Sequence, residues 1–379
     1  MKRFWAAALL LSAIAAGTGS DDAQKVKLLG CDKAVTPLCA TVVHGALKGY
    51  ATTSQLTALS KGSPVTYLDR VKVPTLLIQG QEDRLFNLNE AAATYKTLTA
   101  QGTPVKMIWA QTGHSSITVN PGEVRLDQFD RQSQYLTGRI SDWFDHYLKG
   151  ASVSTGASFA YFRDWIDYTG NAAPAYASSD TFPVGSARNF YLSQGAKLVE
   201  APGLIKPGVQ ALVATPLRLP TSTEPIDLLA GALSPYVYSD QSSDLPGTAM
   251  TWTTEALPAA MAVAGAPTLD VQLTATAARL TQGSGPGGQL VLYAKILDVA
   301  PDGTASLVGM QNAPFRVVDV TKPVQVVLPA IVHRFEAGHK LRVVIAASSP
   351  NYVGGLITAP VSVATGASTQ VLRMPEVAG

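Results

Sequence analysis

Two short strand-like runs stand out early in the chain, at residues 75–79 and 105–109, and each directly follows a proline. Runs of this length are too short for helices and are typical of strands buried on both faces of a parallel sheet. Between them, Ala91, Tyr95 and Leu98 recur at the spacing of one helical face. The pattern therefore predicts a strand–helix–strand unit with a right-handed crossover.

The strongest helical pattern covers residues 131–148. Gly150 follows it, where a left-handed residue commonly ends a helix. The shorter helix between the two strands has Asn87 or Asn89 as its candidate N-cap. The apolar face expected for the longer helix is wide and consists of Leu136, Ile140, Trp143, Phe144 and Tyr147.

From about residue 151 the apolar positions alternate instead of following a helical period. Short alternating runs bounded by Gly, Pro or Asp predict an antiparallel sandwich. Pro301-Asp302-Gly303 predicts a turn between two of its strands. Residues 200–250 are rich in proline and weakly patterned, so we expect long loops there. The alternating runs lie at 158–162, 269–273, 290–296, 324–328 and 341–345.

Candidate catalytic groups follow the two early strands. Gly80 ends the first strand and Asp83 comes shortly after it, while the loop after the second strand carries Gly113-His114. In an open α/β sheet, catalytic groups collect at the carboxyl ends of the strands. An acid and then a histidine on successive loops are two members of a Ser-His-Asp triad, in the chain order of α/β-hydrolases.

These residues carry a family resemblance. Residues 73–86 with Gly113-His114 resemble the last two sheet strands of hydrolases of the X-Pro dipeptidyl-peptidase and cocaine-esterase type. Residues 63–67 are similar to that family's approach to the first of these strands, and residues 334–341 resemble a strand entry in its jelly-roll. The resemblance implies a partial α/β-hydrolase sheet with a helical cap remnant, followed by an all-β jelly-roll sandwich.

The same resemblance implies a division into a cap remnant at 1–72, the C-terminal part of the hydrolase domain at 73–150, and the jelly-roll at 151–379. By matching position, Asp83 is the triad acid and His114 the triad base. The implied substrates are small esters, amides or X-Pro peptides. No cofactor and no metal ion is expected. His333 and His339, in the jelly-roll region, are expected to be structural.

The nucleophile is the departure from the family pattern. The elbow Gly-x-Ser-x-Gly occurs nowhere in the 379 residues. Ser115 and Ser116 adjoin His114 in sequence, and a serine so close cannot easily reach the far nitrogen of that ring. We therefore expect the chain to be inactive as given. The alternative is a non-catalytic jelly-roll binding or interaction protein that keeps a hydrolase remnant.

We also expect the hydrolase part of this chain to be truncated, with an incomplete sheet. The strand at 75–79 should have a neighbour on each side in a full sheet, and only the strand at 105–109 is available to it. An apolar edge with unpaired backbone groups is a feature that natural proteins avoid exposing. Residues 1–150 are accordingly expected to be proteolytically labile when the sandwich is resistant.

The N-terminal segment has two interpretations. Lys2-Arg3 followed by an apolar stretch ending in small residues has the form of a secretory signal. The absent front half of the hydrolase instead favours an internal helix of the cap, which is the interpretation we prefer. Cys31 and Cys39 are equally compatible with a disulfide and with two apolar thiols.

Composition excludes one class of partner. The net charge is +2 with 15% charged residues and no basic stripe, whereas nucleic-acid binding needs clustered Lys and Arg. The apolar N-terminal stretch is too short for a comfortable bilayer span of about 20 residues, so no membrane partner is expected. The location of the protein, its substrate and its oligomeric state stay open.

Overall fold

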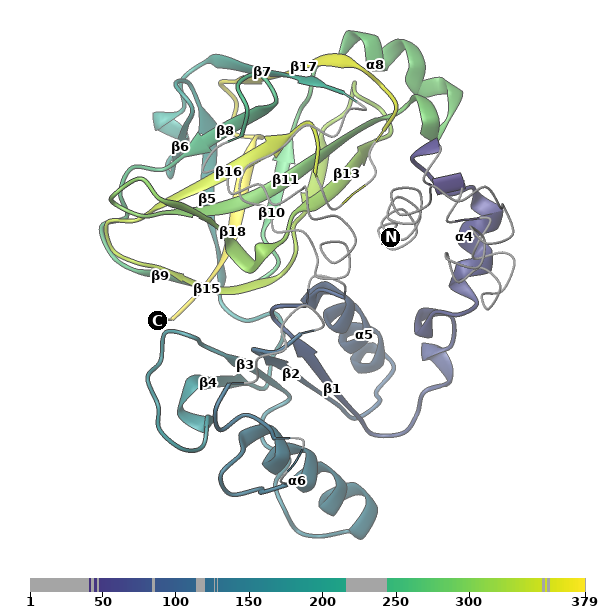
Figure 1. The fold of residues 1–379 in the computed structure, drawn as a ribbon, viewed down its shortest axis with the longest axis vertical. Helices are drawn as coiled ribbons and strands as arrows, with labels where there is room; N and C mark the ends of the chain where they lie inside the picture. The colour runs from purple at the N-terminus through teal and green to yellow at the C-terminus, as the bar shows by residue number, and fades with distance from the viewer. Residues whose placement is uncertain are drawn as a thin grey trace, which may run out of the picture.

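The computed structural model describes residues 41, 44–45, 48–83, 86–113, 120–125, 127, 129–215, 244–349, 352 and 355–378. They form a small α/β part, at the bottom of Figure 1, and a larger β domain, at the top. Three sequence predictions lie outside the described residues: the interpretation of the N-terminal segment, the state of Cys31 and Cys39, and the placement of His114.

The α/β part contains the predicted strand–helix–strand unit. β1 and β2 are parallel, with Ile78 opposite Ile108, and α5 connects them. Asn87 caps α5, because its side chain accepts a hydrogen bond from Asn89 N at 3.2 Å. The elements are β1 (Thr75–Gly80), α5 (Leu88–Ala100), β2 (Val105–Ala110), α6 (Tyr135–Lys149), β3 (Phe159–Phe162) and β4 (Tyr176–Ser179). Three-residue 3-10 turns accompany them: η1 (Pro64–Thr66), η2 (Leu68–Arg70) and η3 (Ala173–Ala175).

α6 begins later than the pattern predicted. Residues 131–133 form a turn, and the helix starts at Tyr135. It ends as expected at Gly150, which has a φ of 69° and donates its N–H to Asp145 O. Glycine reaches this left-handed conformation without the steric cost that a Cβ would bring.

The expectation that the run at 158–162 opens the sandwich is wrong. β3 pairs in parallel with β2, and β4 pairs antiparallel with β3, so the sheet has the order β1-β2-β3-β4. All four residues of β3 are buried. In a strand buried on both faces, apolar and polar residues do not alternate. The sequence of such a strand therefore does not show whether it pairs in parallel or antiparallel.

The β domain is a curled and mainly antiparallel assembly, in which β6 and β8 form one short parallel pair. Hydrogen bonds link twelve of the described strands into one sheet, and β7 and β17 form a separate pair. Its strands are β5 (Ser186–Ser193), β6 (Lys197–Val199), β7 (Gly208–Ala214), β8 (Ala249–Thr253), β9 (Met261–Gly265), β10 (Thr268–Val271), β11 (Leu290–Val299), β12 (Ala305–Leu307), β13 (Ala313–Val317), β14 (Val324–Val327), β15 (Ile331–Phe335), β16 (Lys340–Ala346), β17 (Ala359–Thr365) and β18 (Val371–Val377).

The curl encloses one large apolar core. Trp252, Phe190 and Phe335 are among the fully buried side chains in it, together with the alternating residues of β10, β11 and β16 that the sequence predicted. The predicted turn at 301–303 is present, and Gly303 has a φ of 91°. The sequence pattern missed the short helix α8 (Thr276–Thr281), β7 inside the region expected to be loops, and several strands in which no alternating run was identified, such as β5 and β18.

An N-terminal arm joins the two parts along one side. It contains α4 (Thr53–Ser60), which Figure 1 shows at the right. At its start, Arg316 Nη2 of the β domain donates to Gly49 O at 3.0 Å. At its end, Gln101 Nε2 beside α5 donates to Leu68 O at 2.9 Å. The arm is thus attached at both ends, as a strap between the two parts.

Candidate functional site

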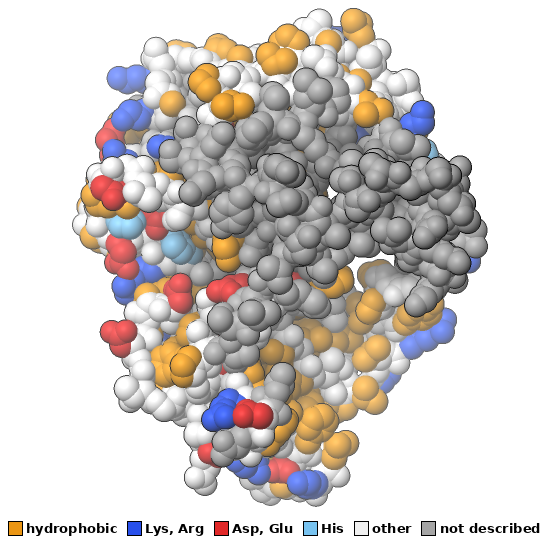
Figure 2. Space-filling view, in the orientation of Figure 1, with side chains coloured by type: hydrophobic (Ala, Val, Ile, Leu, Met, Phe, Trp, Pro, Cys, Tyr) orange, Lys and Arg blue, Asp and Glu red, His pale blue; other side chains and the backbone are white. Residues whose placement is uncertain are grey.

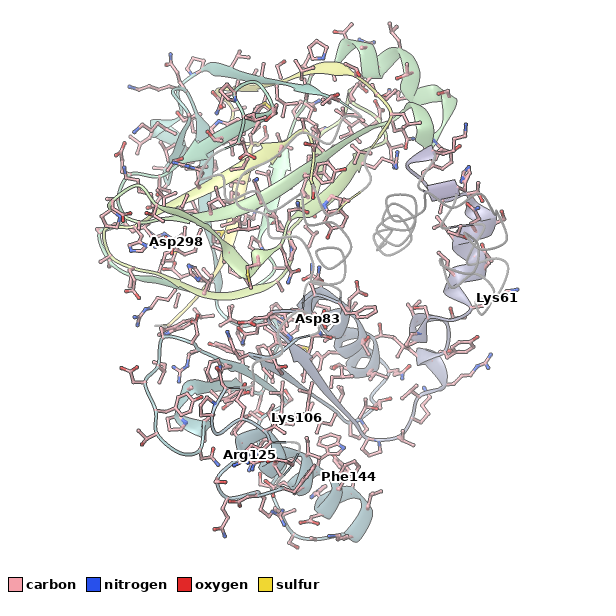
Figure 3. The ribbon with its side chains drawn as sticks, in the orientation of Figure 1. Lys61, Asp83, Lys106, Arg125, Phe144 and Asp298 are labelled. Carbon is pink, nitrogen blue, oxygen red and sulfur yellow. The ribbon has the colours of Figure 1, made fainter. Side chains whose placement is uncertain are left out.

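Asp83 lies at the carboxyl end of β1, at the top of the α/β sheet and directly beneath the β domain (Figure 3). Its side chain is 2% exposed. One carboxylate oxygen, Oδ1, accepts from Phe86 N at 2.7 Å, and Oδ2 accepts from Gln79 Nε2 at 3.0 Å. These bonds fix the orientation of a buried carboxylate, as a triad acid requires.

The loops after β1 and β2 touch at two glycines. A Cβ on Gly80 would lie 1.6 Å from Thr112 O, and a Cβ on Gly113 would lie 2.4 Å from Asp83 N. Side chains at either position would collide with backbone, so the approach requires glycine. Gly113 is the residue immediately before His114. The backbone at Gly113, which leads to His114, therefore lies beside Asp83. The placement of His114 itself is outside the described residues.

A row of polar side chains runs behind this contact. Gln111 Nε2 donates to Glu82 Oε1 at 2.9 Å, and Gln111 N donates to Glu123 Oε1 at 3.3 Å. The Tyr176 hydroxyl donates to the same Glu123 oxygen. This chain of bonds ties the loop after β1 to the loop after β2 and to β4.

Glu123 is fully buried, and its second oxygen, Oε2, has no hydrogen-bond partner among the described residues. Burial raises the pKa of the Glu123 carboxyl, and the bond from Tyr176 opposes that shift. Burial likewise raises the pKa of Asp164, the acid that follows β3. Sequence analysis identified neither residue, because nothing in the local pattern distinguishes them from acids on exposed loops.

The β domain contacts the site directly. Gln311 Nε2 donates to Asp83 O at 3.1 Å, across 228 positions of sequence. Asn89, in the first turn of α5, bonds to Leu328 O and to Ala330 N, each at 3.0 Å. A side chain of the β domain thus holds the loop at Asp83, and backbone groups of the β domain hold the first turn of α5.

A second cluster lies within the β domain. His333 Nε2 and His339 Nδ1 each lie 2.8 Å from a different oxygen of Asp298. Burial opposes ionisation of Asp298, but the two histidine bonds outweigh it and lower the pKa of that carboxyl. Sequence analysis paired the histidines without finding their shared acid. Figure 3 labels Asp298 in the β domain, apart from Asp83.

One edge of the α/β sheet is open among the described residues. β1 pairs with β2 on one side, and no described strand pairs with its other side. Ile78 of β1 is 38% exposed, and Phe144 of α6 is 51% exposed. In Figure 2, hydrophobic side chains gather on the lower part of the molecular surface that the view shows. Tyr147, which also belongs to the predicted apolar face of α6, is exposed, and so is the neighbouring Leu148.

Among the described residues, no group of three or more His, Cys, Asp or Glu side chains is arranged to hold a metal ion. None of the helices they form has the length and apolar character needed to cross a bilayer.

Comparison with protein families gives two matches. Residues 164–355 match the model of the X-Pro dipeptidyl-peptidase C-terminal non-catalytic domain. Residues 45–151 match the prolyl oligopeptidase family. No curated protein matches the sequence of the chain. β3 lies between the two matches, and β4, which lies inside the match at 164–355, completes the sheet of the region at 45–151.

Solved structures share the fold at low sequence identity. An α-amino acid ester hydrolase is 19% identical with a TM-score of 0.62, covering 96% of this chain and 65% of its own. An aminopeptidase from a marine sediment Thaumarchaeota archaeon is 17% identical with a TM-score of 0.57, covering 82% and 56%. A CocE/NonD family hydrolase from Staphylococcus aureus is 13% identical with a TM-score of 0.52, covering 82% and 55%. The chain thus spans between 55% and 65% of the length of these structures.

Proposed function

This chain belongs to the X-Pro dipeptidyl-peptidase C-terminal domain family, and on that premise we propose that it is the acid–histidine part of a serine hydrolase. Its substrates are small esters, amides or X-Pro peptides. The observation that carries the proposal is the contact of Gly113 with the backbone of Asp83, which brings the chain at His114 to a buried carboxylate.

The proposed roles follow from the chemistry of the triad. Asp83 accepts a hydrogen bond from His114 Nδ1, which fixes the tautomer of the ring and stabilises the imidazolium that forms during turnover. His114 Nε2 takes the proton of a serine hydroxyl and returns it to the leaving group. The bonds that Asp83 accepts from Phe86 N and Gln79 Nε2 hold its carboxylate in one orientation, as this role requires.

The serine and the oxyanion donors come, in this proposal, from a nucleophile half that adds further strands beside β1. The open edge of β1 and the exposed apolar side chains of Ile78 and Phe144 support that arrangement. Without that half, His114 has no hydroxyl to activate, and no oxyanion hole stabilises the intermediate. The chain alone is accordingly inactive.

The β domain is, in this proposal, a jelly-roll that holds the site without contributing a catalytic group, and the arm carrying α4 is the remnant of a helical cap. The bond from Gln311 to the Asp83 carbonyl supports the holding role. The alternative, a non-catalytic binding protein with a hydrolase remnant, is favoured by one finding, the non-catalytic description of the domain that matches residues 164–355.

The pairing of Asp83 with His114 is testable without turnover. In proton NMR spectra, a histidine Nδ1–H bonded to a buried carboxylate gives a resonance far downfield. We expect that resonance in the wild-type chain and its loss in Asp83→Asn. Glu82→Gln is the matched control, because Glu82 is the adjacent acid and bonds to Gln111 instead. A resonance that survives Asp83→Asn, or is absent from the wild type, contradicts the assignment.

Reactivity toward a fluorophosphonate probe tests the missing nucleophile. We expect no labelled serine and no hydrolysis of p-nitrophenyl acetate or Ala-Pro-p-nitroanilide above the level of the His114→Ala variant. Labelling of one serine that disappears in His114→Ala would show that a nucleophile is present in this chain after all.

A further inference from the structure

A cavity of about 360 Å³ lies on the α6 side of the sheet, at the amino end of β2. This is the opposite end of the strand from the loop that leads to His114. Lys106 is the only member of β2 that lines it, and this lysine is 3% exposed. Figure 3 labels Lys106 in the region of α6. The other lining side chains include Arg131, Tyr135, Arg139, Asn171, Tyr176 and Ser178.

Two cationic groups converge at Gly156. A Cβ placed on Gly156 would lie 3.0 Å from Arg139 Nη1 and 3.4 Å from Lys106 Nζ. Gly156 has a φ of 70°, and its lack of a side chain leaves the space between the two cations open. Lys106 uses one N–H on the carbonyl of Ala157, and its remaining N–H groups have no partner among the described residues.

The remaining polar groups of the lining are mostly donors. Arg139 Nη2 bonds to Asp142, but Arg139 Nη1 has no partner among the described residues. Both oxygens of Asp142 are occupied, one by Arg139 and one by Arg131. The side-chain amide of Asn171 donates from Nδ2 to Gln132 O and accepts at Oδ1 from Ala173 N. Among the described residues, the lining therefore offers no acceptor for Arg139 Nη1 or for the remaining N–H groups of Lys106.

We propose that this cavity binds a small oxyanion, a carboxylate or a phosphate group, between Lys106 and Arg139. The anion accepts charge-assisted hydrogen bonds from Lys106 Nζ and Arg139 Nη1, and the exposed hydroxyl of Ser178 is available at the mouth. The proposal is independent of the triad, which lies at the other end of the strand.

The protonation of Lys106 supports this site. Burial, followed by the repulsion from Arg139, lowers the pKa of Lys106 from 10.5 to about 8, and Asp180 and Asp142 counteract the shift in part. An anion that binds the ammonium form raises that pKa again, so binding weakens when the pH rises above the pKa of the free protein. The other groups facing the cavity are Arg131 of the preceding turn and the phenols of Tyr135 and Tyr176.

Isothermal titration of the full chain with sodium acetate, and separately with inorganic phosphate, tests the proposal. We expect saturable binding of one anion per chain by at least one probe. Acetate binding alone identifies a carboxylate site, and tighter phosphate binding identifies a phosphate site. Lys106→Met and Arg139→Gln should each weaken binding about 10- to 100-fold, because each removes a charged hydrogen bond.

Lys340→Met is the matched control. Lys340 lines a separate cavity of about 330 Å³ in the β domain, with Lys197 and Arg342. Binding should be unchanged in this variant. Acetate affinity should also fall between about pH 7 and about pH 10, approaching tenfold per pH unit above the Lys106 pKa. No saturable binding by either probe, or binding lost in Lys340→Met and kept in Lys106→Met, overturns the proposal.

Discussion

The two faces of the α/β sheet are built from the same strands and differ in what covers them. The α5 face is an apolar core that includes Trp109, Phe159 and Leu88, and the β domain adds Ala264 and Ala330 to it. The α6 face begins with an apolar core around Ile108 and Leu136. Toward its edges, however, it buries Lys106 and Glu123 and contains the cavity lined by Lys106 and Arg139.

This difference shows where the protein depends on the β domain. The α5 face is closed from above by residues of a distant part of the chain, so its core spans both parts. Among the described residues, no side chain of the β domain belongs to the core on the α6 face. Lys106 and Glu123, whose pKa values are shifted, lie on that side. Buried titratable groups cost stability, which apolar packing on the opposite face must offset.

Trp109→Ala should have the largest effect. Trp109 is completely buried on the α5 face and packs edge-to-face against Phe159 and Phe182 at 4.9 and 5.5 Å between ring centroids. We expect a loss of about 3–5 kcal/mol in the free energy of unfolding, from lost burial and the cavity left behind. Urea unfolding followed by far-UV circular dichroism measures it.

Phe144→Ala is the control for that loss. Phe144 is an aromatic residue of similar size on α6 and is 51% exposed. Its removal should change the free energy of unfolding by less than about 1 kcal/mol. Equal losses for the two variants would show that the α5 face is not the dominant core of the α/β part.

Lys106→Met should stabilise the protein near neutral pH, by an amount on the order of 2 kcal/mol, because it removes a buried cation and keeps the side-chain volume. The pKa of Lys106 is about 8 in the folded state against 10.5 for a free lysine. The unfolded state therefore binds more protons between these values, and wild-type stability rises with pH there. The advantage of the variant should shrink over that range in urea unfolding at a series of pH values. A pH-independent advantage contradicts the burial of a charged lysine.

Glu123→Gln should alter the pH dependence with the opposite sign. Burial raises the folded-state pKa of Glu123 above its ordinary value of 4.5, so the wild type loses stability as the pH rises above that value. The free energy of unfolding of the variant, relative to that of the wild type, should therefore increase as the pH rises above 4.5. Glu255→Gln is the control, because its bond from Lys197 lowers the pKa of an exposed carboxyl, and its small effect should run the other way.

The sequence predicted the elements whose signals are local. The two strands and the helix between them each follow from a short run of residues, and so do an N-cap at Asn87 or Asn89 and the end of α6 at Gly150; the structure has the cap at Asn87. The membership of β3 in the α/β sheet depends on pairing with β2, which a run of four buried residues does not encode. The start of α6 was placed too early, because the polar turn at 131–133 continues the helical charge pattern without helical hydrogen bonds.

The candidate site was predictable only in part, for a similar reason. Asp83 was found because it follows a strand, and its pairing with His114 stays a prediction. The run at 105–109 predicted a strand buried on both faces, but nothing in it showed which groups a buried Lys106 would contact. The expected lability of residues 1–150 also stays a prediction. The core shared by α5 with Ala264 and Ala330 argues that proteolysis will not separate the parts cleanly near residue 151.

Gln311→Ala should have the smallest effect and tests the contact between the parts. Its side chain donates one hydrogen bond to the Asp83 carbonyl, so its loss should cost about 1 kcal/mol. Since the Asp83 N–H bonds to Gly80 O within the same loop, local opening should accelerate its hydrogen exchange while the amides of β16 are unaffected. Gln325→Ala removes a comparable but exposed bond to Asp270 and should leave the Asp83 amide unchanged. If both variants leave Asp83 exchange unaltered, the loop is held by its own glycine contacts, and the β domain covers the site without restraining it.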